Sequence, residues 1–360
     1  MAKNFFKKFD DETKLKLEIF EDYFKEWLPV FIKNAINYHW TECFIYDFFA
    51  GAGKDSEKQF GSPLIILKTI NDNIDDIIKS KLQITFTVNE FDGETFKTLK
   101  ENINNYLETN QRVKDNIKIE FYNEDFKKLF NEIKFEYDKP NFMFLDQFGV
   151  KQISEDVFQK LISFKRNDFL FFISSTHIKR FGDSPEFQKH LKIKRESFEN
   201  AKPFHAHRIV FEFYKSLINN TYVIAPFSIK KNLNIHGLIF GSNHSYGVEK
   251  FLKVCWEINP NTGDANYNID EEKIIDGQMS IFEEDNKIKK LSYLEEKISK
   301  WIKEGVSLHD IYIKTMEFGC QPKHANSILR ELIKNGKINK IHLKNDRIHK
   351  VDDKVKIELL

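Results

Sequence analysis

The chain has little cysteine. Only Cys43, Cys255 and Cys320 occur among 360 residues, and each stands far from the others in the sequence. No CxxC pair and no cysteine and histidine spacing typical of a zinc site occurs, which argues against a disulfide framework and against a structural zinc ion. We therefore expect three buried, reduced thiols and no bound metal.

The chain also lacks a long hydrophobic run. No apolar stretch approaches the roughly 20 residues that a membrane-spanning helix needs, and the first ten residues hold no unbroken apolar segment of signal-peptide length. Hydrophobic residues nevertheless make up 41% of the chain, with 36 phenylalanines, which is enough for a large core. We expect a cytoplasmic protein, and the length predicts about two domains.

The net charge is only +1, but the charge is unevenly distributed along the chain. Residues 287–360 hold 17 Lys and Arg against 10 Asp and Glu, a surplus of seven positive charges, so the first 286 residues carry a net charge of −6. The C-terminal part is the basic part, and it is the part in which we look for an anionic partner.

Short apolar runs alternate with amphipathic segments over most of the chain, a pattern typical of an α/β fold with a parallel sheet. The last two runs are separated by only five residues, too few for a crossover helix, so they should pair as an antiparallel hairpin. This order favours a class I methyltransferase-like Rossmann sheet of seven strands over a plain dinucleotide-binding domain. The expected strands are residues 43–49, 84–89, 117–122, 142–145, 169–174, 222–229 and 235–241.

The sequence predicts four parts. A helix over about residues 11–37 dominates an N-terminal helical segment, 1–40, and the Rossmann domain follows over 41–258. Residues 259–290 are polar and acidic and are interpreted as a linker. Residues 291–360 show three helical segments and then a β-ribbon of residues 337–343 and 347–351, the order of a small winged-helix domain.

A glycine loop follows the first expected strand in the sequence Asp47-Phe48-Phe49-Ala50-Gly51-Ala52-Gly53. Glycines at such a turn let a cofactor approach the backbone, and Asp47 stands where a carboxylate can reach the methionine end of S-adenosylmethionine. The candidate cofactor-binding residues of this loop are Asp47, Phe48, Ala50, Gly51 and Gly53. Many α/β proteins carry such glycines for turn geometry alone, so both interpretations stand at this point.

Acidic residues also follow the next strands. Glu90 comes directly after the second strand, where a carboxylate commonly accepts hydrogen bonds from ribose hydroxyls, and Asp125 follows the third strand, where it can receive an adenine amino group. Either carboxylate can instead be solvated or cap a helix. Their joint placement after successive strands favours a cofactor site.

The fourth strand ends in Asp146-Gln147-Phe148-Gly149. In amino-methyltransferases this loop holds an acidic or amide residue, prolines and an aromatic residue, which polarise the target nitrogen and stack on the base. Asp146 and Phe148 can fill these two roles, and Gln147 can hydrogen-bond a base edge. We take these three as the candidate catalytic residues.

The basic C-terminal domain suggests DNA as partner, although winged helices also dock proteins. The third helix would enter the major groove, and the ribbon would bring basic side chains near phosphates. The candidate DNA-binding residues are Lys323, Asn326, Ser327, Arg330, Lys344 and Arg347, with His324 on the same helix.

The acidic linker holds a short segment, Gln278-Met279-Ser280-Ile281-Phe282, with the glutamine and the terminal Ile-Phe pair of bacterial sliding-clamp-binding peptides. A linker segment that packs on its own domain explains the same five residues. Both interpretations are kept.

Several of these motifs together resemble the three-Cys-motif partner protein (TcmP) family. The resemblance covers most of residues 10–260. It rests on Tyr23-Phe24-Lys25-Glu26-Trp27-Leu28, the glycine loop, Gly61-Ser62-Pro63-Leu64, the Asp146 turn, and the hairpin ending in Leu238-Ile239-Phe240-Gly241-Ser242.

The resemblance implies a methyltransferase-like fold in bacterial proteins that are often encoded beside a protein resembling a radical S-adenosylmethionine enzyme. The three cysteines of the family name belong to that partner. Where the family tends to have proline after the aspartate, this chain has Gln147, so the loop is less rigid.

The leading hypothesis is an S-adenosylmethionine-dependent methyltransferase that acts on DNA in a bacterial repair or defence system. One alternative is a non-catalytic DNA-binding partner of the radical-enzyme-like protein. A second alternative is an RNA methyltransferase.

Overall fold

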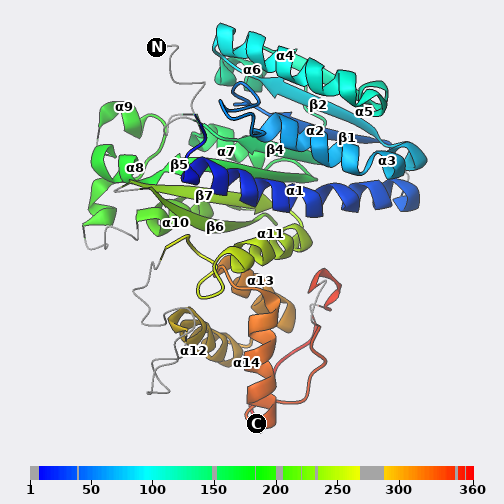
Figure 1. Ribbon diagram of the computed structural model, residues 1–360. Helices are drawn as coiled ribbons and strands as arrows, with labels where there is room; N and C mark the ends of the chain where they lie inside the picture. The colour runs from blue at the N-terminus through cyan, green and yellow to red at the C-terminus, as the bar shows by residue number, and fades with distance from the viewer. Residues whose placement is uncertain are drawn as a thin grey trace.

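A sheet covered by helices forms the larger part of the molecule, and a group of three helices lies beneath it (Figure 1). The structure is a computed structural model. It describes residues 8–38, 40–147, 152–182, 184–199, 206–219, 221–231, 234–267, 288–344, 348–352 and 354–360. None of the helices in these ranges combines the length and the apolar character that a membrane span requires.

The sheet has seven strands in the order β3-β2-β1-β4-β5-β7-β6. The strands β1 to β5 are parallel, and β1 lies between β2 and β4. Their bounds are Glu42–Asp47, Gln83–Asn89, Ile117–Tyr122, Asn141–Leu145 and Asn167–Ser174 for β1 to β5, then Val223–Lys231 and Asn234–Ser242 for β6 and β7.

The last two strands form an antiparallel hairpin, and β7 also pairs antiparallel with β5. The sequence predicts this reversal because too few residues separate the strands for a crossover helix. The predicted methyltransferase-like Rossmann sheet is therefore confirmed, with strand ends within three residues of those expected.

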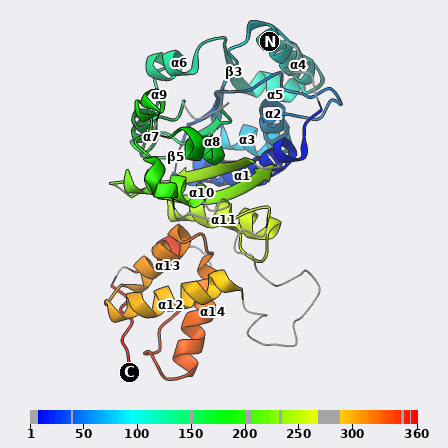
Figure 2. The ribbon, with the colours of Figure 1, turned by 90° about the vertical axis from the view of Figure 1, so that its left-hand side faces the viewer.

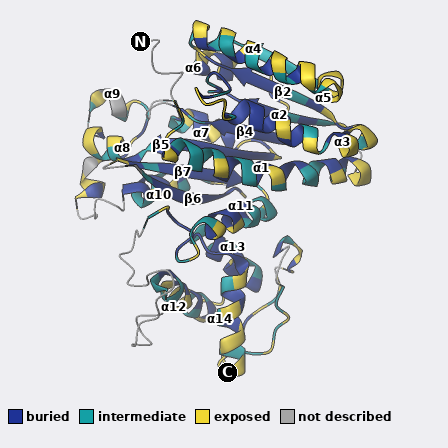
Figure 3. Cartoon of the chain, viewed as in Figure 1, coloured by how far each residue is buried: buried dark blue, intermediate teal, exposed yellow. Residues whose placement is uncertain are grey.

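Helices cover both faces of the sheet, because alternate strand residues point to opposite sides. On β1, Ile45 belongs to one core cluster and Tyr46 to the other. Figure 3 shows the strands buried between the helical layers. On the Ile45 side lie α1 (Asp11–Tyr38), α2 (Ser62–Asp72), α3 (Ile74–Ser80), α4 (Gly93–Thr109), α5 (Gln111–Asn116) and α11 (Ser245–Ile258). On the Tyr46 side lie α6 (Phe126–Glu132), α7 (Glu155–Leu161), α8 (Ser175–Phe181) and α10 (Ala206–Ser216). The short α9 (Pro185–Gln188) and the 3-10 helix η2 (Arg195–Phe198) lie between α8 and α10 in the chain.

The long helix α1 crosses the middle of the sheet. Phe20 and Phe24 pack on Phe142 and Phe144 of β4, and the Tyr23 hydroxyl donates a 2.5 Å hydrogen bond to Asp168 at the start of β5. These contacts fix the direction of α1, so its first turn lies at the end of the sheet where β1 and β4 finish. The three cysteines are free and buried, as expected.

The C-terminal domain contains α12 (Lys289–Lys303), α13 (Leu308–Glu317), α14 (Pro322–Lys334) and the 3-10 helix η5 (Ile348–Lys350). Ser307 caps α13, since its hydroxyl accepts a hydrogen bond from the Asp310 amide at 3.1 Å. Figure 2 shows the three helices gathered beneath α11. Their buried side chains join the core cluster of the α11 side of the sheet, so the two domains share one hydrophobic core.

The predicted β-ribbon is not found among the described residues of this domain. Ile338 instead forms an antiparallel bridge with Leu359 near the chain end, and residues 348–350 form η5. The carbonyl of Lys344 accepts hydrogen bonds from Asn326 and Tyr312, which draws this segment onto α13 and α14. Side-chain partners from the helices thus replace the ladder that the alternating sequence predicts.

The predicted linker 259–290 begins as packed structure. Among its described residues, Thr262, Asp264 and Ala265 are buried, and Asp264 pairs through its backbone carbonyl with the Ser228 amide of β6. Residues 268–287 lie outside the described residues, and with them the sliding-clamp-like segment Gln278 to Phe282.

A buried lysine joins the two domains. The Lys290 ammonium, at the start of α12, forms an ion pair with Asp264, donates to the Thr262 carbonyl at 2.7 Å and to the Gly319 carbonyl at 3.0 Å, and lies 5.3 Å from the Trp256 ring centre. Three oxygens and an aromatic face replace the water that this charge loses on burial, as a buried charge requires.

We expect Lys290→Ala to lower the free energy of unfolding by about 3 kcal/mol, because it leaves Asp264 buried with part of its counter-charge removed. Chemical denaturation measures this. Lys300→Ala is the matched control on the same helix, since the Lys300 side chain is 75% exposed and its removal should cost under about 0.5 kcal/mol. Equal stability of the two variants would contradict a structural role for Lys290.

Candidate functional site

The candidate site lies where the parallel strands end. Because β1 pairs with β2 on one side and β4 on the other, the residues at their carboxyl ends share one edge of the sheet, where ligands of open α/β sheets bind. Asp47, Glu90 and Asp146 all stand there, and the last two each raise the pKa of Asp47 electrostatically. The structure thus brings together three of the predicted site residues.

The glycine loop has the backbone that its sequence predicts. Gly51 and Gly53 adopt φ angles of +58° and +80°, in the left-handed region that favours glycine. A Cβ added to Gly51 would meet nothing within 4 Å, whereas one on Gly53 would lie 3.3 Å from Leu99 Cδ1 of α4. Gly53 therefore serves packing, and Gly51 leaves the backbone open to a ligand.

The loop from residue 54 to residue 60 is closed by its own contacts. The Gly61 amide donates to the Gly53 carbonyl at 2.8 Å, and the Asp55 carboxylate accepts from the amides of Phe9, Glu57 and Gln59. Gly61 is the N-cap of α2 and Ser62 its first residue, with Pro63 in the first turn. The extra residues after the glycine loop are thus held in place without disturbing it.

Asp47 is fully buried beneath the loop. Its Oδ1 accepts from the Phe49 amide at 3.3 Å, while its buried Oδ2 makes no hydrogen bond of good geometry. Burial raises the pKa of Asp47 to about 7, against opposing contributions from the Ser62 hydroxyl and the Phe49 amide. A cation placed beside Oδ2 would find a carboxylate that is costly to ionise alone.

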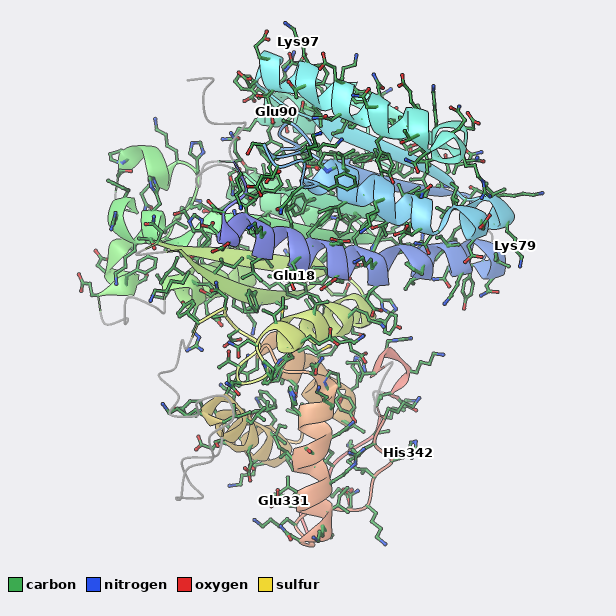
Figure 4. All side chains as sticks on the ribbon, viewed as in Figure 1. Glu18, Lys79, Glu90, Lys97, Glu331 and His342 are labelled. Carbon is green, nitrogen blue, oxygen red and sulfur yellow. The ribbon has the colours of Figure 1, made fainter. Side chains whose placement is uncertain are left out.

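Glu90 lies beside the glycine loop, and Figure 4 labels it there. Its Oε2 accepts from the Gly51 amide at 3.0 Å and its Oε1 from the Asp92 amide at 2.9 Å. Burial raises the pKa of Glu90 despite these hydrogen bonds. Each carboxylate oxygen retains a lone pair for a further donor, so the position suits hydroxyl groups of a bound ligand.

The other predicted cofactor residues have structural partners. Asp125 is exposed and caps α6, since its Oδ1 accepts from the Lys128 amide at 3.1 Å. Phe48 is buried, and its ring packs against Phe126 and Phe130 in the core. The Ala50 amide donates to the Asn89 carbonyl at 3.0 Å, which joins the loop to β2.

The turn after β4 is fastened by Gln147. Its Nε2 donates to the Phe172 carbonyl of β5 at 2.9 Å, and its Oε1 accepts from the Gln152 amide at 3.0 Å. The side chain is buried, with 5% of the residue exposed. Both ends of the amide are therefore used on backbone. Phe148, the third predicted catalytic residue, lies outside the described residues.

Asp146 is paired with a lysine that the sequence reasoning missed. The Lys16 ammonium of α1 lies 3.1 Å from Asp146 Oδ1 and 3.5 Å from Glu12 Oε1, and 4.6 Å from the centre of the Phe172 ring. Burial alone would lower the pKa of Lys16, but Asp146 and Glu12 outweigh it and raise the pKa. His236 of β7 lies 3.6 Å from Glu12.

A signal for this network exists in the sequence. Glu12 and Lys16 are four residues apart and continue, at helical spacing, into the buried stripe of Ile19 and Tyr23. A charged pair on the apolar face of a helix needs buried partners. That pattern identifies Lys16, although it does not identify Asp146 as its partner.

In the winged-helix domain the predicted DNA contacts divide into two groups. Lys323, Ser327 and Arg330 are exposed on α14. Asn326 is fully buried, where its Oδ1 accepts from the Tyr312 hydroxyl at 2.6 Å and its Nδ2 donates to the Lys344 carbonyl. The Asn326 side chain thus holds the domain together.

The remaining predicted contacts lie beyond α14. The Lys344 ammonium donates to the Lys350 carbonyl at 2.9 Å, and Arg347 lies outside the described residues. Sequence reasoning missed Lys334 and Lys337, which are also exposed. Their spacing from Arg330 on the helix, which sequence shows, could have found them.

Comparison with known proteins supports the winged helix. Residues 266–344 match the family model of the GMT-like wHTH domain. No curated protein matches the chain. The C-terminal part is therefore a winged helix-turn-helix domain, a fold that suggests DNA binding.

Metal ligands are not gathered in the described part of the chain, where no group of three or more His, Cys, Asp or Glu side chains could hold a metal ion. Two cavities are found away from the Asp146 turn. One, of about 390 Å³, lies between α1 and α2 and is lined by Phe9, Leu17 and Phe60 among others. The other, of about 530 Å³, lies beside α10.

We expect Asp47→Asn to stabilise the protein at high pH. The pKa of Asp47 is raised by burial to about 7, so the stability that the protonated group contributes is complete below about pH 4 and is lost as the pH rises through 7. The variant should therefore gain about 4 kcal/mol on the wild type between pH 4 and pH 8.5. Urea denaturation at both pH values measures the gain, and a pH-independent difference would contradict it.

Proposed function

We propose that this chain is an S-adenosylmethionine-dependent methyltransferase that acts on DNA. The observation that carries the proposal is the open backbone at Gly51, flanked by Glu90 on one side and the buried Asp47 on the other. The winged helix-turn-helix domain supports DNA as the substrate. The resemblance to the three-Cys-motif partner family supports a role in a bacterial repair or defence system, beside a radical-enzyme-like protein.

The residues present fit the cofactor. Glu90 offers two carboxylate oxygens to ribose hydroxyls, and Asp47 offers a buried oxygen without a hydrogen bond to the cofactor's ammonium group. When bound, S-adenosylmethionine supplies an electrophilic methyl group. Because transfer to a positioned nitrogen depends mainly on proximity and orientation, few catalytic side chains are needed.

Asp146 is the residue we place against the target. Lys16 engages its Oδ1 at 3.1 Å, which leaves Oδ2 to accept a hydrogen bond from an exocyclic amine. A carboxylate held in this way orients the amine and favours positive charge on the nitrogen as it is alkylated. Gln147 supports the turn from behind rather than touching the base, since its amide is already used on backbone.

Glu90→Ala should lower the affinity for S-adenosylhomocysteine at least tenfold, because it removes both hydroxyl acceptors and the acceptor of the Gly51 amide. Isothermal titration calorimetry on folded protein measures this. Glu94→Ala is the matched control, since the Glu94 side chain is 76% exposed and lies only one helical turn away. Failure of the folded wild type to bind either S-adenosylmethionine or S-adenosylhomocysteine would overturn the proposal.

Lys16→Met should reduce tritium transfer from labelled S-adenosylmethionine to duplex DNA at least tenfold, while the affinity for S-adenosylhomocysteine stays within threefold. Methionine fills the same space but leaves Asp146 without its counter-charge. Lys14→Met is the control, because Lys14 is more exposed and pairs with Asp11 instead. Undiminished transfer by Lys16→Met would show that Lys16 does not position Asp146.

A second candidate function is a non-catalytic DNA-binding adaptor that keeps the cofactor fold as a scaffold. The engagement of Gln147 with backbone and of Asp146 with Lys16 favours it, because both polar side chains of the turn have partners within the protein. Wild-type protein that binds DNA but transfers no tritium label would support the adaptor over the enzyme.

A further inference from the structure

The first turn of α14 is docked against the Rossmann domain. The Trp256 indole of α11 donates to the Gly319 carbonyl at 2.9 Å, and its ring lies 4.1 Å from the His324 ring, centre to centre. Gln321 and Pro322 are buried, and Lys290 holds the Gly319 carbonyl from the other side at 3.0 Å. Figures 1 and 2 both show α13 and the beginning of α14 against α11, with the rest of α14 extending away.

This docking affects how the helix can meet a duplex. A helix-turn-helix domain that reads sequence places the N-terminal residues of its recognition helix against base edges in the major groove. Here α11 and the packed residues 262–265 stand beside that end of α14. Joined to them by Lys290 and Trp256, the N-terminal end of α14 has a protein domain where the groove walls would have to pass.

The side chains suited to base reading are also occupied. Asn326, of the type that pairs with adenine, is buried on Tyr312 and the Lys344 carbonyl. The His324 Nδ1 accepts from the Gln321 amide at 3.2 Å. Burial first, then Lys323 and Lys290, lower the pKa of His324 to about 3, so its ring is neutral in the interface.

What α14 leaves exposed is a basic stripe, which we define as Lys323, Ser327, Arg330, Lys334 and Lys337. The first four recur at intervals of four, three and four residues, so they share one face of the helix, and all five are exposed. Residues 321–344 hold six Lys and Arg against one acidic residue, Glu331. Figure 3 shows exposed residues along the part of α14 that points away from the Rossmann domain.

We propose that the winged-helix domain binds duplex DNA through the basic stripe, by contacts to the phosphate backbone and without reading base sequence. Lysine, arginine and serine donate hydrogen bonds to phosphates and carry affinity without sequence information. The proposal rests on DNA as the partner in the proposed function and deepens it. Any choice of target would then lie with the Rossmann edge around Asp146.

Fluorescence anisotropy with the full chain and labelled 30-base-pair duplexes of three unrelated sequences tests this. We expect dissociation constants that agree within threefold. The double variant Arg330→Ala, Lys334→Ala should bind all three about equally more weakly, and the slope of log affinity against log salt should become shallower by about 1.8, or about 0.9 for each phosphate that no longer meets a cationic side chain. The double variant Lys79→Ala, Lys97→Ala, with both lysines on the Rossmann domain (Figure 4), should leave the slope unchanged.

Selection of bound duplexes from a random library completes the test. No enriched sequence is expected. An enriched site bound about 1,000-fold more tightly than bulk duplex, with the preference abolished in Arg330→Ala, would overturn backbone-only binding while leaving a DNA-directed function in place. Absence of duplex binding, or a preference for structured RNA over duplex DNA in competition, would overturn both this proposal and DNA as the substrate, whereas calorimetry with S-adenosylhomocysteine reports on the cofactor site independently.

Discussion

The parallel pairing of β1 with β2 and β4 is the constraint on which the candidate site depends. It brings the carboxyl ends of three strands to one edge, so that Asp47, Glu90 and Asp146 face the same space although nearly 100 residues of chain separate the first from the last. Carboxyl groups in one place repel each other and resist burial. The pKa values of Asp47 and Glu90 are raised accordingly, and the site favours cationic and hydrogen-donating ligands.

The long helix α1 balances part of this negative charge. Its aromatic stripe packs on β4 and its tyrosine is tied to Asp168, which sets the register of the helix on the sheet. That register delivers the Lys16 ammonium to Asp146, and Phe172 lies under the ammonium while its carbonyl holds Gln147. The N-terminal segment is thus part of the candidate site, and the turn after β4 is held from two sides before any ligand arrives.

Docking of the winged helix-turn-helix domain changes what that domain can do. A buried lysine, an indole and a continuous hydrophobic core join it to α11. The same contacts that attach the domain cover the end of α14 that would read bases, and they leave a basic face on the far half. A domain attached in this way suits holding DNA near the Rossmann edge better than choosing a site along it.

The sequence by itself determined the strand order class, the antiparallel closing hairpin and the three C-terminal helices, because periodicity, short connections and caps are local signals. It also located Asp47, Glu90 and Asp146, since each directly follows a strand. Only the tertiary structure decided which polar side chains are free to act. Asp125 caps a helix, Asn326 and Gln147 hold backbone groups, and Lys16 reaches Asp146 across 130 residues. These roles depend on partners distant in the chain, because a buried polar group acquires its function from whatever satisfies its hydrogen bonds and charge.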